Sequence, residues 1–425
     1  MRNVYNLFVL QSRFADHITH FNKYPDMSKI KVLQIHEYYQ QPGGEDTVFE
    51  SDVALLRDRG HEVVTYVDNN ERINAIGSAS LAMQTIYSQD SYRKTLDVII
   101  REMPDIAHFH NTFPLISPAA YYACRKVDVP VIQSLHNPRL ACPAASFYRN
   151  GKNCTDCLGK ALPYPGILYS CYRHSKTQTG VVAAMLGFHR LLGTWNKMVD
   201  VYIVASDFYG DLFARAGLPK DKIVYKPHFV GLPIAYEERR EPGKYALFIG
   251  RLDPEKGVRT LLDAWRQCAV PLKIRGSGQL EGEVRKFIEQ NPEGNIELVG
   301  RLSKGELNQL IAGARFLVWP TESYYETFGF VAVESFALGV PVIGSRIGVN
   351  AEIVEDGVTG LHFAAGDSVD LAGKVKWAWE HPGEMTQMGR NARREYEAKY
   401  TADRNYGMLT GIYQRVIALK RDRAG

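Results

Sequence analysis

Residues 245–257 read Tyr-Ala-Leu-Phe-Ile-Gly-Arg-Leu-Asp-Pro-Glu-Lys-Gly and combine a strand, a loop and the start of a helix. The apolar run is continuous rather than alternating, which is typical of a strand covered by helices on both faces. The loop begins at Gly250 and carries Arg251 and Lys256. Two cations beside a helix N-terminus favour a diphosphate ligand, because Arg binds it bidentately and Lys adds a point charge. A solvated basic loop is the alternative interpretation.

Along most of the chain, short apolar runs alternate with longer stretches whose apolar residues have the spacing of a helix. Helices are predicted between the runs, for example at 45–59, 258–265 and 304–314. Two such series predict an α/β protein with two doubly wound, Rossmann-like domains that face a central cleft. The predicted strands occupy residues 30–36, 62–67, 105–110, 129–136 and 199–206 in the first half, and 245–249, 272–275, 296–299, 314–319 and 340–344 in the second.

The chain is predicted to divide into four parts. They are an N-terminal extension at 1–26, an N-terminal domain at 27–231, a C-terminal domain at 232–404 and a final helix at 405–425. The stretch 231–244 is predicted to be the linker, because it contains two prolines and a cluster of charges. Ligands of doubly wound domains bind beyond the carboxyl ends of the strands, so the predicted site lies in the cleft.

The composition indicates the broad class of protein. Apolar residues make up 45% and charged residues 23% of the 425, which is typical of a soluble globular chain. The net charge of +4 does not favour nucleic-acid binding and is compatible with small anionic ligands. No apolar run reaches the roughly 18 residues that cross a bilayer, and residues 1–26 lack the features of a signal peptide. We therefore expect a cytoplasmic protein.

A second stretch, residues 326–334, reads Glu-Thr-Phe-Gly-Phe-Val-Ala-Val-Glu. Glu326 lies in a predicted loop, and Glu334 lies within a predicted helix at 330–338. Gly329 lets the backbone approach a ligand, and the helix N-terminus can hold an anion. One carboxylate before the helix and one within it suit a ligand with phosphate and hydroxyl groups, such as a sugar nucleotide. The alternative is a surface loop and a helix with two solvated glutamates.

Two features of the first half are compatible with the same kind of ligand. Gly43 and Gly44 follow the first predicted strand and can present backbone N–H groups to a phosphate, with a plain turn as the alternative. His136 ends another predicted strand, where folds of this type place working residues. A structural histidine is the alternative for that position.

His108, His110 and Asn111 lie on or directly after a third predicted strand. The two histidines alternate along this strand and therefore face the same way. Because they have no acidic or cysteine partner nearby in the sequence, they do not define a metal site. We predict that all three residues line the cleft.

Four of the six cysteines are grouped within residues 142–171, a predicted insertion. They are Cys142, Cys154, Cys157 and Cys171. A Cys-x-x-Cys pair with two further cysteines at loop distances resembles a four-thiolate zinc site. We expect a structural zinc ion here. Two disulfides, an iron–sulfur cluster or reduced thiols are the alternatives.

With these motifs, the chain resembles a retaining glycosyltransferase of family 4, in the group of glycogen synthases and mannosyltransferases. The resemblance extends from about residue 29 to the C-terminus and rests on residues 43–44, 108–111, 250–257, 276–278, 326–334 and 339–344. The family implies the GT-B fold, in which the last helix crosses back to the N-terminal domain. Residues 406–419 are therefore expected to pack there.

The resemblance implies a role for each matching residue. Arg251 and Lys256 would grip the donor diphosphate, and Glu334 would bind the ribose hydroxyls of the nucleotide. Glu326 would hold the donor sugar and orient its anomeric carbon, with His136 beside that sugar. Further donor contacts are expected from Gly43, Gly44, Gly250, Arg301, Thr327, Phe328, Gly329 and Phe330.

The implied reaction transfers a sugar from a UDP- or GDP-sugar to an acceptor, with retention of anomeric configuration. Two fixed cations would stabilise the departing diphosphate, whose oxygen would accept the acceptor's proton. No metal or cofactor is expected for catalysis, and the chain contains no Asp-x-Asp triplet. The alternatives are a sugar-nucleotide epimerase or phosphorylase of the same fold, and a non-catalytic subunit that binds a sugar nucleotide.

The resemblance leaves the acceptor open among a glycan, a lipid-linked molecule and a small molecule. It suggests polysaccharide or lipid-linked glycan assembly. Peripheral contact with the inner face of a membrane is expected on the same ground, and no nucleic-acid partner is expected.

Overall fold

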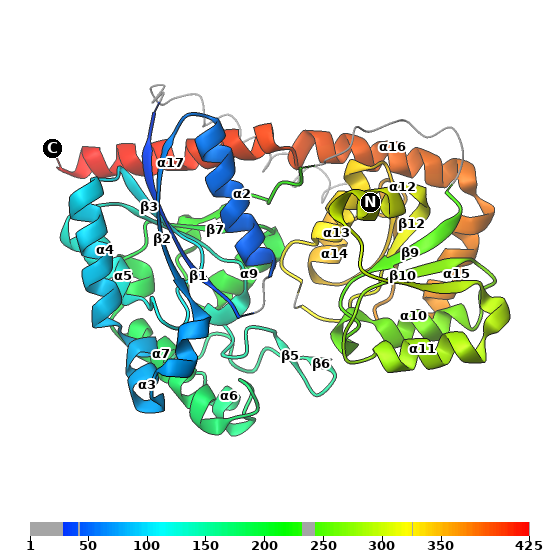
Figure 1. Ribbon diagram of the computed structural model, residues 1–425, viewed down its shortest axis with the longest axis horizontal. Coiled ribbons are helices and arrows are strands. Elements are labelled where there is room, and N and C mark those ends of the chain that lie inside the picture. Colours follow the sequence, from blue (N-terminus) through cyan, green and yellow to red (C-terminus); the bar gives the residue numbers. More distant parts are fainter. Residues whose placement is uncertain (1–28, 41–42, 232–242, 325, 425) are drawn as a thin grey trace, which may run out of the picture.

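The structure, a computed structural model, describes residues 29–40, 43–231, 243–324 and 326–424. The predicted extension at 1–26 and most of the predicted linker at 231–244 lie outside the described residues. The described residues form two α/β domains side by side, with a pair of long helices running along one edge of both (Figure 1).

The N-terminal domain is built on a parallel sheet with the strand order β2-β1-β3-β4-β7-β8. The order reverses between β1 and β3, so the crevice beyond these two strands is a position for ligands. β1 is buried along most of its length, although Gln34, His36 and Glu37 interrupt its apolar residues. The strands are β1 (Lys31–Tyr38), β2 (Glu62–Asn69), β3 (Ile106–Phe109), β4 (Val131–Ser134), β7 (Val201–Val204) and β8 (Ile223–Tyr225).

The C-terminal domain is built on a second parallel sheet, with the order β11-β10-β9-β12-β13-β14. Here the order reverses between β9 and β12. This is the strand order of dinucleotide-binding domains. The strands are β9 (Tyr245–Ile249), β10 (Leu272–Arg275), β11 (Ile296–Val299), β12 (Ala314–Trp319), β13 (Val342–Ser345) and β14 (Gly360–Phe363).

Helices cover both faces of each sheet, and their starts follow from local sequence. The helices α4, α7, α9 and α12 each begin after a serine whose hydroxyl accepts a hydrogen bond from the first turn. The N-terminal helices are α2 (Gly44–Asp58), α3 (Ser78–Ile86), α4 (Gln89–Glu102), α5 (Ala119–Lys126), α6 (Tyr164–Leu168), α7 (Lys176–Leu191), α8 (Thr194–Lys197) and α9 (Asp207–Arg215). The C-terminal helices are α10 (Val258–Trp265), α11 (Glu281–Gln290), α12 (Lys304–Gly313), α13 (Phe330–Ala337), α14 (Gly348–Ile353), α15 (Ser368–Glu380), α16 (Pro382–Lys399) and α17 (Ala402–Ala424).

The final helix, α17, packs on the N-terminal sheet rather than on the domain that precedes it. Leu409 and Ile412 of α17 are buried in one apolar cluster with Val32 and Ile106. A larger cluster is shared by both domains and includes Val230, Phe328 and Tyr400 at their junction. The domains therefore meet through buried apolar surface as well as through polar contacts.

The two-domain α/β architecture predicted from the sequence is confirmed, and all ten predicted strands are present. The sequence missed β8, β14 and a hairpin formed by β5 (Tyr148–Arg149) and β6 (Lys152–Asn153). β5 and β6 have two residues each and β8 has three, which is too few for an apolar pattern, and the four residues of β14 include His362. Among the described residues, no helix is long and apolar enough to cross a bilayer.

Candidate functional site

Two loops meet at the carboxyl edge of the C-terminal sheet. One follows β9 and contains residues 250–257, and the other follows β12 and contains residues 320–329. β9 and β12 are the neighbours between which the strand order reverses. In doubly wound sheets this position holds the ligand. The fold therefore brings together the predicted cations and Glu326, although Lys256 and Glu326 are 70 positions apart in the sequence.

Lys256 and Glu326 form the central pair of the site. Lys256 Nζ lies 2.7 Å from Glu326 Oε2, and Glu326 Oε1 accepts a hydrogen bond from Gly329 N–H at 3.1 Å. Burial raises the pKa of Glu326, but the charge of Lys256 and the N–H of Gly329 outweigh this effect and hold that pKa below its usual value. Glu326 is therefore an ionised carboxylate at neutral pH, able to accept hydrogen bonds.

Arg251 lies on the solvent side of the same loop. Its guanidinium forms ion pairs with Asp253 at 2.7 Å and with Glu255 at 2.9 Å. The side chain is 54% exposed, and its charge also lowers the pKa of Glu326. Arg251 and Lys256 thus place two positive charges at one crevice, and a ligand can reach Arg251 directly.

Two glycines allow these loops to approach each other. Gly257 has a φ of +71°, and a Cβ there would lie 1.9 Å from Pro320 O. Gly329 has a φ of +81°, and a Cβ there would lie 2.2 Å from the ring of Trp319. Both positions require left-handed backbone and no side chain. The geometry of the central pair therefore depends on glycine at both positions.

Glu334 lies in the second turn of α13. Burial raises its pKa to about 6, while the charges of Lys304 and Arg275 act in the opposite direction. These two cations come from α12 and from the end of β10, and no sequence motif marks them as site residues. Arg301, which was predicted to contact the donor, is exposed in the turn between β11 and α12.

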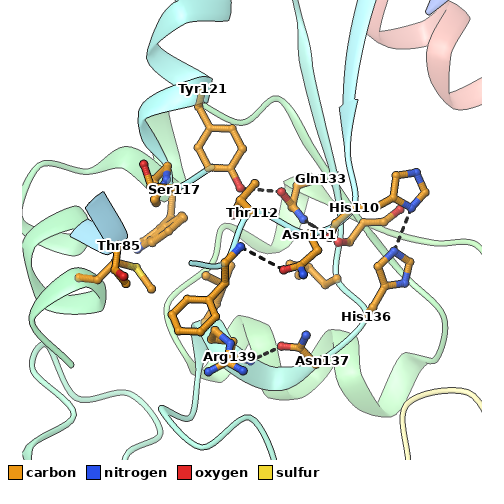
Figure 2. Close-up of a pocket in the computed structure, with 17 residues that line it drawn as sticks. Thr85, His110, Asn111, Thr112, Ser117, Tyr121, Gln133, His136, Asn137 and Arg139 are labelled. Carbon is orange, nitrogen blue, oxygen red and sulfur yellow. Dashed lines mark hydrogen bonds between the residues drawn. The ribbon is translucent and has the colours of Figure 1, made fainter. Parts of the chain in front are cut away.

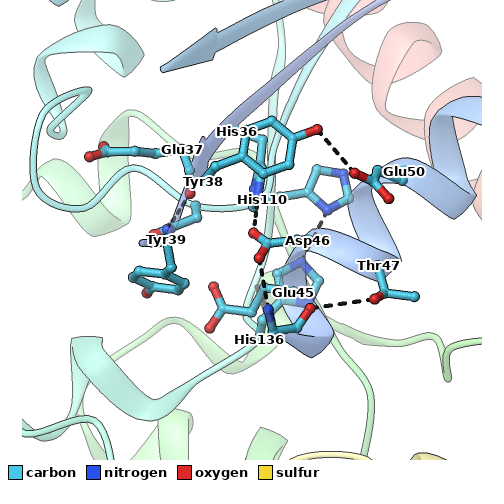
Figure 3. A network of polar contacts seen from close by, with 12 residues as sticks. His36, Glu37, Tyr38, Tyr39, Glu45, Asp46, Thr47, Glu50, His110 and His136 are labelled. Carbon is cyan, nitrogen blue, oxygen red and sulfur yellow. Dashed lines mark hydrogen bonds and ion pairs between the residues drawn. The ribbon is translucent and has the colours of Figure 1, made fainter. Parts of the chain in front are cut away.

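Across the domain interface, α2 begins at the Gly43-Gly44 turn. Asp46 fixes this turn, because one carboxylate oxygen accepts from Gly43 N–H and the other lies against His36 Nε2, both at 2.8 Å (Figure 3). The N–H of Gly43 is thus already used within the domain. A Cβ on Gly44 would lie 3.6 Å from the ring of Phe330, so Gly44 reaches the N-terminus of α13.

His136 follows β4 and lines a pocket of the N-terminal domain (Figure 2). The neighbouring His110 donates from Nε2 to Gln34 Oε1 at 2.8 Å, since a carboxamide oxygen only accepts. Burial lowers the pKa of His110 well below its usual value and that of His136 to about 3, so both rings are neutral. His110 Nδ1 therefore accepts from His136 Nε2 at 3.0 Å. This arrangement leaves His136 Nδ1 as a hydrogen-bond acceptor.

His228 connects this pocket with the C-terminal domain. Its ring centroid lies 5.4 Å from that of His136 and 5.6 Å from that of Phe330, with the latter pair stacked. Phe328 packs on the same histidine at 4.9 Å and is buried. The side chain of Phe328 thus belongs to the domain junction, and only its backbone can contribute to a donor site.

The pocket beside His136 is lined mainly by uncharged groups. Its polar lining includes Asn111, Gln133 and Asn137, and its apolar lining includes the ring of Trp195. The charged exception is Arg139, whose guanidinium lies 4.1 Å from the centre of the Phe113 ring. Such a pocket suits a ligand that is rich in hydroxyl groups.

Glu45 lies next to this pocket. Its Oε1 accepts a hydrogen bond from Asn137 Nδ2 at 2.5 Å. Burial raises the pKa of Glu45 to about 7, with Asn137 and Arg139 acting in the opposite direction. Glu45 therefore exchanges a proton near neutral pH.

Three buried side chains have possible metal-ligand atoms within 4.8 Å of one another. They are Asp52, His108 and His110. Both nitrogens of each histidine are already hydrogen bonded, those of His108 to hydroxyl groups at 2.7 and 2.8 Å. Lys226 Nζ also lies 3.8 Å from Asp52. The group is therefore a buried polar network rather than a metal site.

The four grouped cysteines are free thiols. Burial raises the pKa of Cys157 to about 12, and Cys142, Cys171 and Cys154 add to that effect, so the four lie near one another. Zn–S bonds of 2.3 Å require sulfur atoms roughly 3.8 Å apart. In the part of the chain that the structure describes, no three of these sulfurs lie within 4.8 Å of one another. As placed, they do not form a tetrahedral zinc site.

Several of these residues were missed from the sequence. Asn137 and Glu45 stand next to predicted residues in the chain, and that adjacency was the signal available. His228 and Arg275 had no such signal, because their positions depend on which segments the fold brings together.

The second half of the chain matches a known family. Residues 235–395 match the family model of glycosyl transferases group 1. The match includes both loops of the candidate site.

The chain is 26% identical over 395 residues to an uncharacterized glycosyltransferase of Methanocaldococcus jannaschii, covering 91% of this chain and 99% of that protein. It is 30% identical over 160 residues to D-rhamnosyltransferase WbpZ of Pseudomonas aeruginosa, covering 37% of this chain but only 42% of that protein.

Among solved structures, HepE of Anabaena in complex with UDP is similar with a TM-score of 0.64 and 16% identity, covering 90% of this chain and 98% of that chain. A similarity that spans both domains identifies the fold as GT-B. The predicted GT-B fold is thus confirmed.

Proposed function

We propose that this chain is a retaining, metal-independent glycosyltransferase that uses a nucleoside diphosphate sugar. The observation that carries the proposal is the pair of Lys256 and Glu326, 2.7 Å apart at the strand-order reversal of the domain that matches the glycosyl transferases group 1 family model. Arg251 supplies a second, half-exposed cation at the same loop. This set combines what a sugar diphosphate needs, namely positive charge for phosphate and a carboxylate for hydroxyl groups.

The chemistry follows from the charges. Cleavage of a glycosyl–phosphate bond leaves negative charge on the departing diphosphate, and Arg251 and Lys256 stabilise that charge. Lys256 then divides its hydrogen bonds between Glu326 and phosphate. The departing oxygen accepts the proton of the incoming acceptor hydroxyl, on the same face of the sugar. Closure of the two domains excludes water, which limits hydrolysis of the donor.

Glu326 and Glu334 have different roles in this proposal. Glu326 is held ionised beside Lys256 and orients the donor sugar. Glu334, whose pKa burial raises to about 6, binds the ribose hydroxyls. Titration calorimetry with UDP and GDP tests this assignment. Glu334→Ala should weaken nucleotide binding roughly 10-fold, whereas Glu326→Gln should mainly reduce transfer.

The reverse pattern in the two glutamate variants would show that their roles are exchanged. A wild-type protein that binds neither nucleotide would overturn the donor proposal as a whole. UDP is the first nucleotide to test, because HepE was solved in complex with UDP and in complex with UDP-glucose.

The acceptor is proposed to enter the pocket beside His136 in the N-terminal domain, whose lining is uncharged apart from Arg139. His136 Nδ1 is available there as an acceptor for a hydroxyl group. A glycan hydroxyl, alone or on a lipid carrier, matches that lining better than a charged acceptor does.

A lipid-linked acceptor at a membrane is further supported by one surface of the N-terminal domain. Nearly half of the exposed large apolar side chains among the described residues lie between residues 162 and 192. They include Leu168 and Leu191, which are 63% and 87% exposed. Between Asp156 and Asp200 the sequence contains no acidic residue but five Lys or Arg. Exposed apolar groups among cations suit an anionic lipid surface.

The helices that form this surface also wall the pocket. Thr85 and Met185 line the pocket from α3 and α7, while Met83 and Leu191 of the same helices are exposed. A lipid-linked acceptor lying at the membrane would therefore meet the pocket wall.

Sedimentation with vesicles tests this surface. The protein should bind phosphatidylglycerol-containing vesicles more strongly than pure phosphatidylcholine vesicles. Leu168→Glu with Leu191→Glu should abolish that binding, and the exposed Val369→Glu of the other domain should not. Equal binding by all three proteins would contradict the proposal, and a change in oligomeric state instead would indicate that a second copy covers the surface.

A structural zinc ion in the cysteine insertion is a separate proposal, supported by the cysteine spacing alone. Zinc would have to draw the four sulfurs together from their present positions. Metal analysis of protein purified without added zinc tests it. About one equivalent of zinc per chain would support the proposal, and well under one equivalent would contradict it.

A further inference from the structure

The cysteine insertion carries a hairpin that has no part in the proposed chemistry. Its strands, β5 and β6, are joined by Asn150 and Gly151, which both have positive φ, at +52° and +75°. An Asn-Gly pair is the preferred sequence for a two-residue hairpin turn. Arg149 fixes the hairpin to its base through an ion pair with Asp156 at 2.7 Å and a contact 3.8 Å from the centre of the Tyr169 ring.

The hairpin points from the N-terminal domain toward the C-terminal domain (Figure 1). Its last residue, Asn153, makes two hydrogen bonds across the interface. Asn153 Nδ2 donates to Glu322 O at 2.9 Å, and Asn153 Oδ1 accepts from Tyr324 N–H at 2.8 Å. One carboxamide thus pairs with two backbone groups in the way a neighbouring strand would.

The backbone that Asn153 holds leads directly to Glu326. The same loop is tied from its other side to the loop that carries Lys256, because Glu322 N–H donates to Glu255 O at 3.0 Å. The carboxylate of Glu322 also accepts from Thr260 Oγ1 at 2.5 Å. Asn153 therefore contacts a segment that precedes Glu326 in the chain and is hydrogen bonded to the loop of Lys256.

We propose that this hairpin is a clasp for the closed state, and that Asn153 is a positioning residue for Glu326 and Lys256. The clasp rests on the proposed function and adds to it a link between the insertion and the donor loops. When the domains separate, both hydrogen bonds of Asn153 break together. When they close, the bonds set the register of the loop that carries Glu326.

Amide hydrogen exchange and donor turnover test the clasp together. Asn153→Ala should speed exchange at the Tyr324 amide and lower kcat/KM for the donor roughly 30-fold, as expected for the loss of two hydrogen bonds. Lys152→Ala, at the exposed neighbouring position, is the control and should change neither. Asn153→Asp keeps the acceptor for Tyr324 N–H and should restore slow exchange there, which a general loosening of the hairpin would not do.

Unchanged exchange in Asn153→Ala would overturn the clasp, and faster exchange with normal turnover would overturn the positioning role. Failure of the proposed function would appear elsewhere, as a wild-type protein that binds no UDP. The exchange comparison needs no ligand and decides on the clasp in that case too.

Discussion

The two domains place different chemistry at equivalent positions of similar sheets. At the carboxyl edge of the C-terminal sheet, Lys256 and Glu326 form an ionised pair with a lowered carboxylate pKa. At the corresponding edge of the N-terminal sheet, the rings of His110 and His136 are neutral and the pKa of Glu45 is raised. The fold therefore supplies a crevice in both domains, whereas the local charges determine whether that crevice suits an anion or a neutral polyol.

The largest effect is expected at the charged edge of the C-terminal sheet. Lys256→Ala should lower kcat/KM by at least ~10²-fold, because one of two charges that stabilise the departing diphosphate is lost. Initial rates over a range of donor concentrations measure it. The control is Lys273→Ala, which removes a surface lysine of the same domain that pairs with Glu297. Near-normal turnover in Lys256→Ala would contradict the proposal that the edge of the C-terminal sheet, unlike that of the N-terminal sheet, is built to bind an anion.

A second prediction compares one glycine from each domain. Gly329→Ala should lower the free energy of unfolding by roughly 2 kcal/mol, because a Cβ would strain left-handed backbone and meet Trp319. Gly43→Ala should cost less than about 1 kcal/mol, since its φ is negative and the space beside it is open. Urea denaturation measures both values. Equal costs would show that the donor loops are less tightly packed than their geometry indicates.

The smallest effect concerns the pH dependence of the N-terminal side. Because the pKa of Glu45 is raised to about 7 in the folded protein, the folded state binds this proton more tightly than the unfolded chain. The resulting stability is present below the usual carboxyl pKa and is lost as the pH rises toward 7. Glu45→Gln should therefore give a flatter curve of stability against pH.

Denaturation at a series of pH values between about 4 and 8 measures this slope. Glu50→Gln, at an exposed position of the same helix, should leave the slope as it is. Glu334, whose pKa is also raised, contributes to this slope in both proteins. A slope as steep in Glu45→Gln as in the wild type would therefore contradict the role of Glu45 and weaken the contrast between the domains.

Much of the fold was predictable from the sequence, and the reason is visible in β7 and β9. Strands buried on both faces need continuous apolar runs, and such runs can be recognised in the sequence. The hairpin of β5 and β6 has no such run, because its two-residue strands are half exposed and only Asn150-Gly151 signals a turn. The site residues were predictable for a similar reason. Arg251, Lys256 and Glu326 were found through loops that interrupt apolar runs.

The amino-acid pattern predicts where strands and helices alternate and which residues end the strands, because burial periodicity and turn chemistry are local properties. The folded arrangement of the chain determines which of those ends meet. It joined Lys256 to Glu326, brought His228 between His136 and Phe330, and placed Asn153 on the loop before Glu326. Such contacts depend on strand order and domain packing, which connect residues that are far apart in the chain.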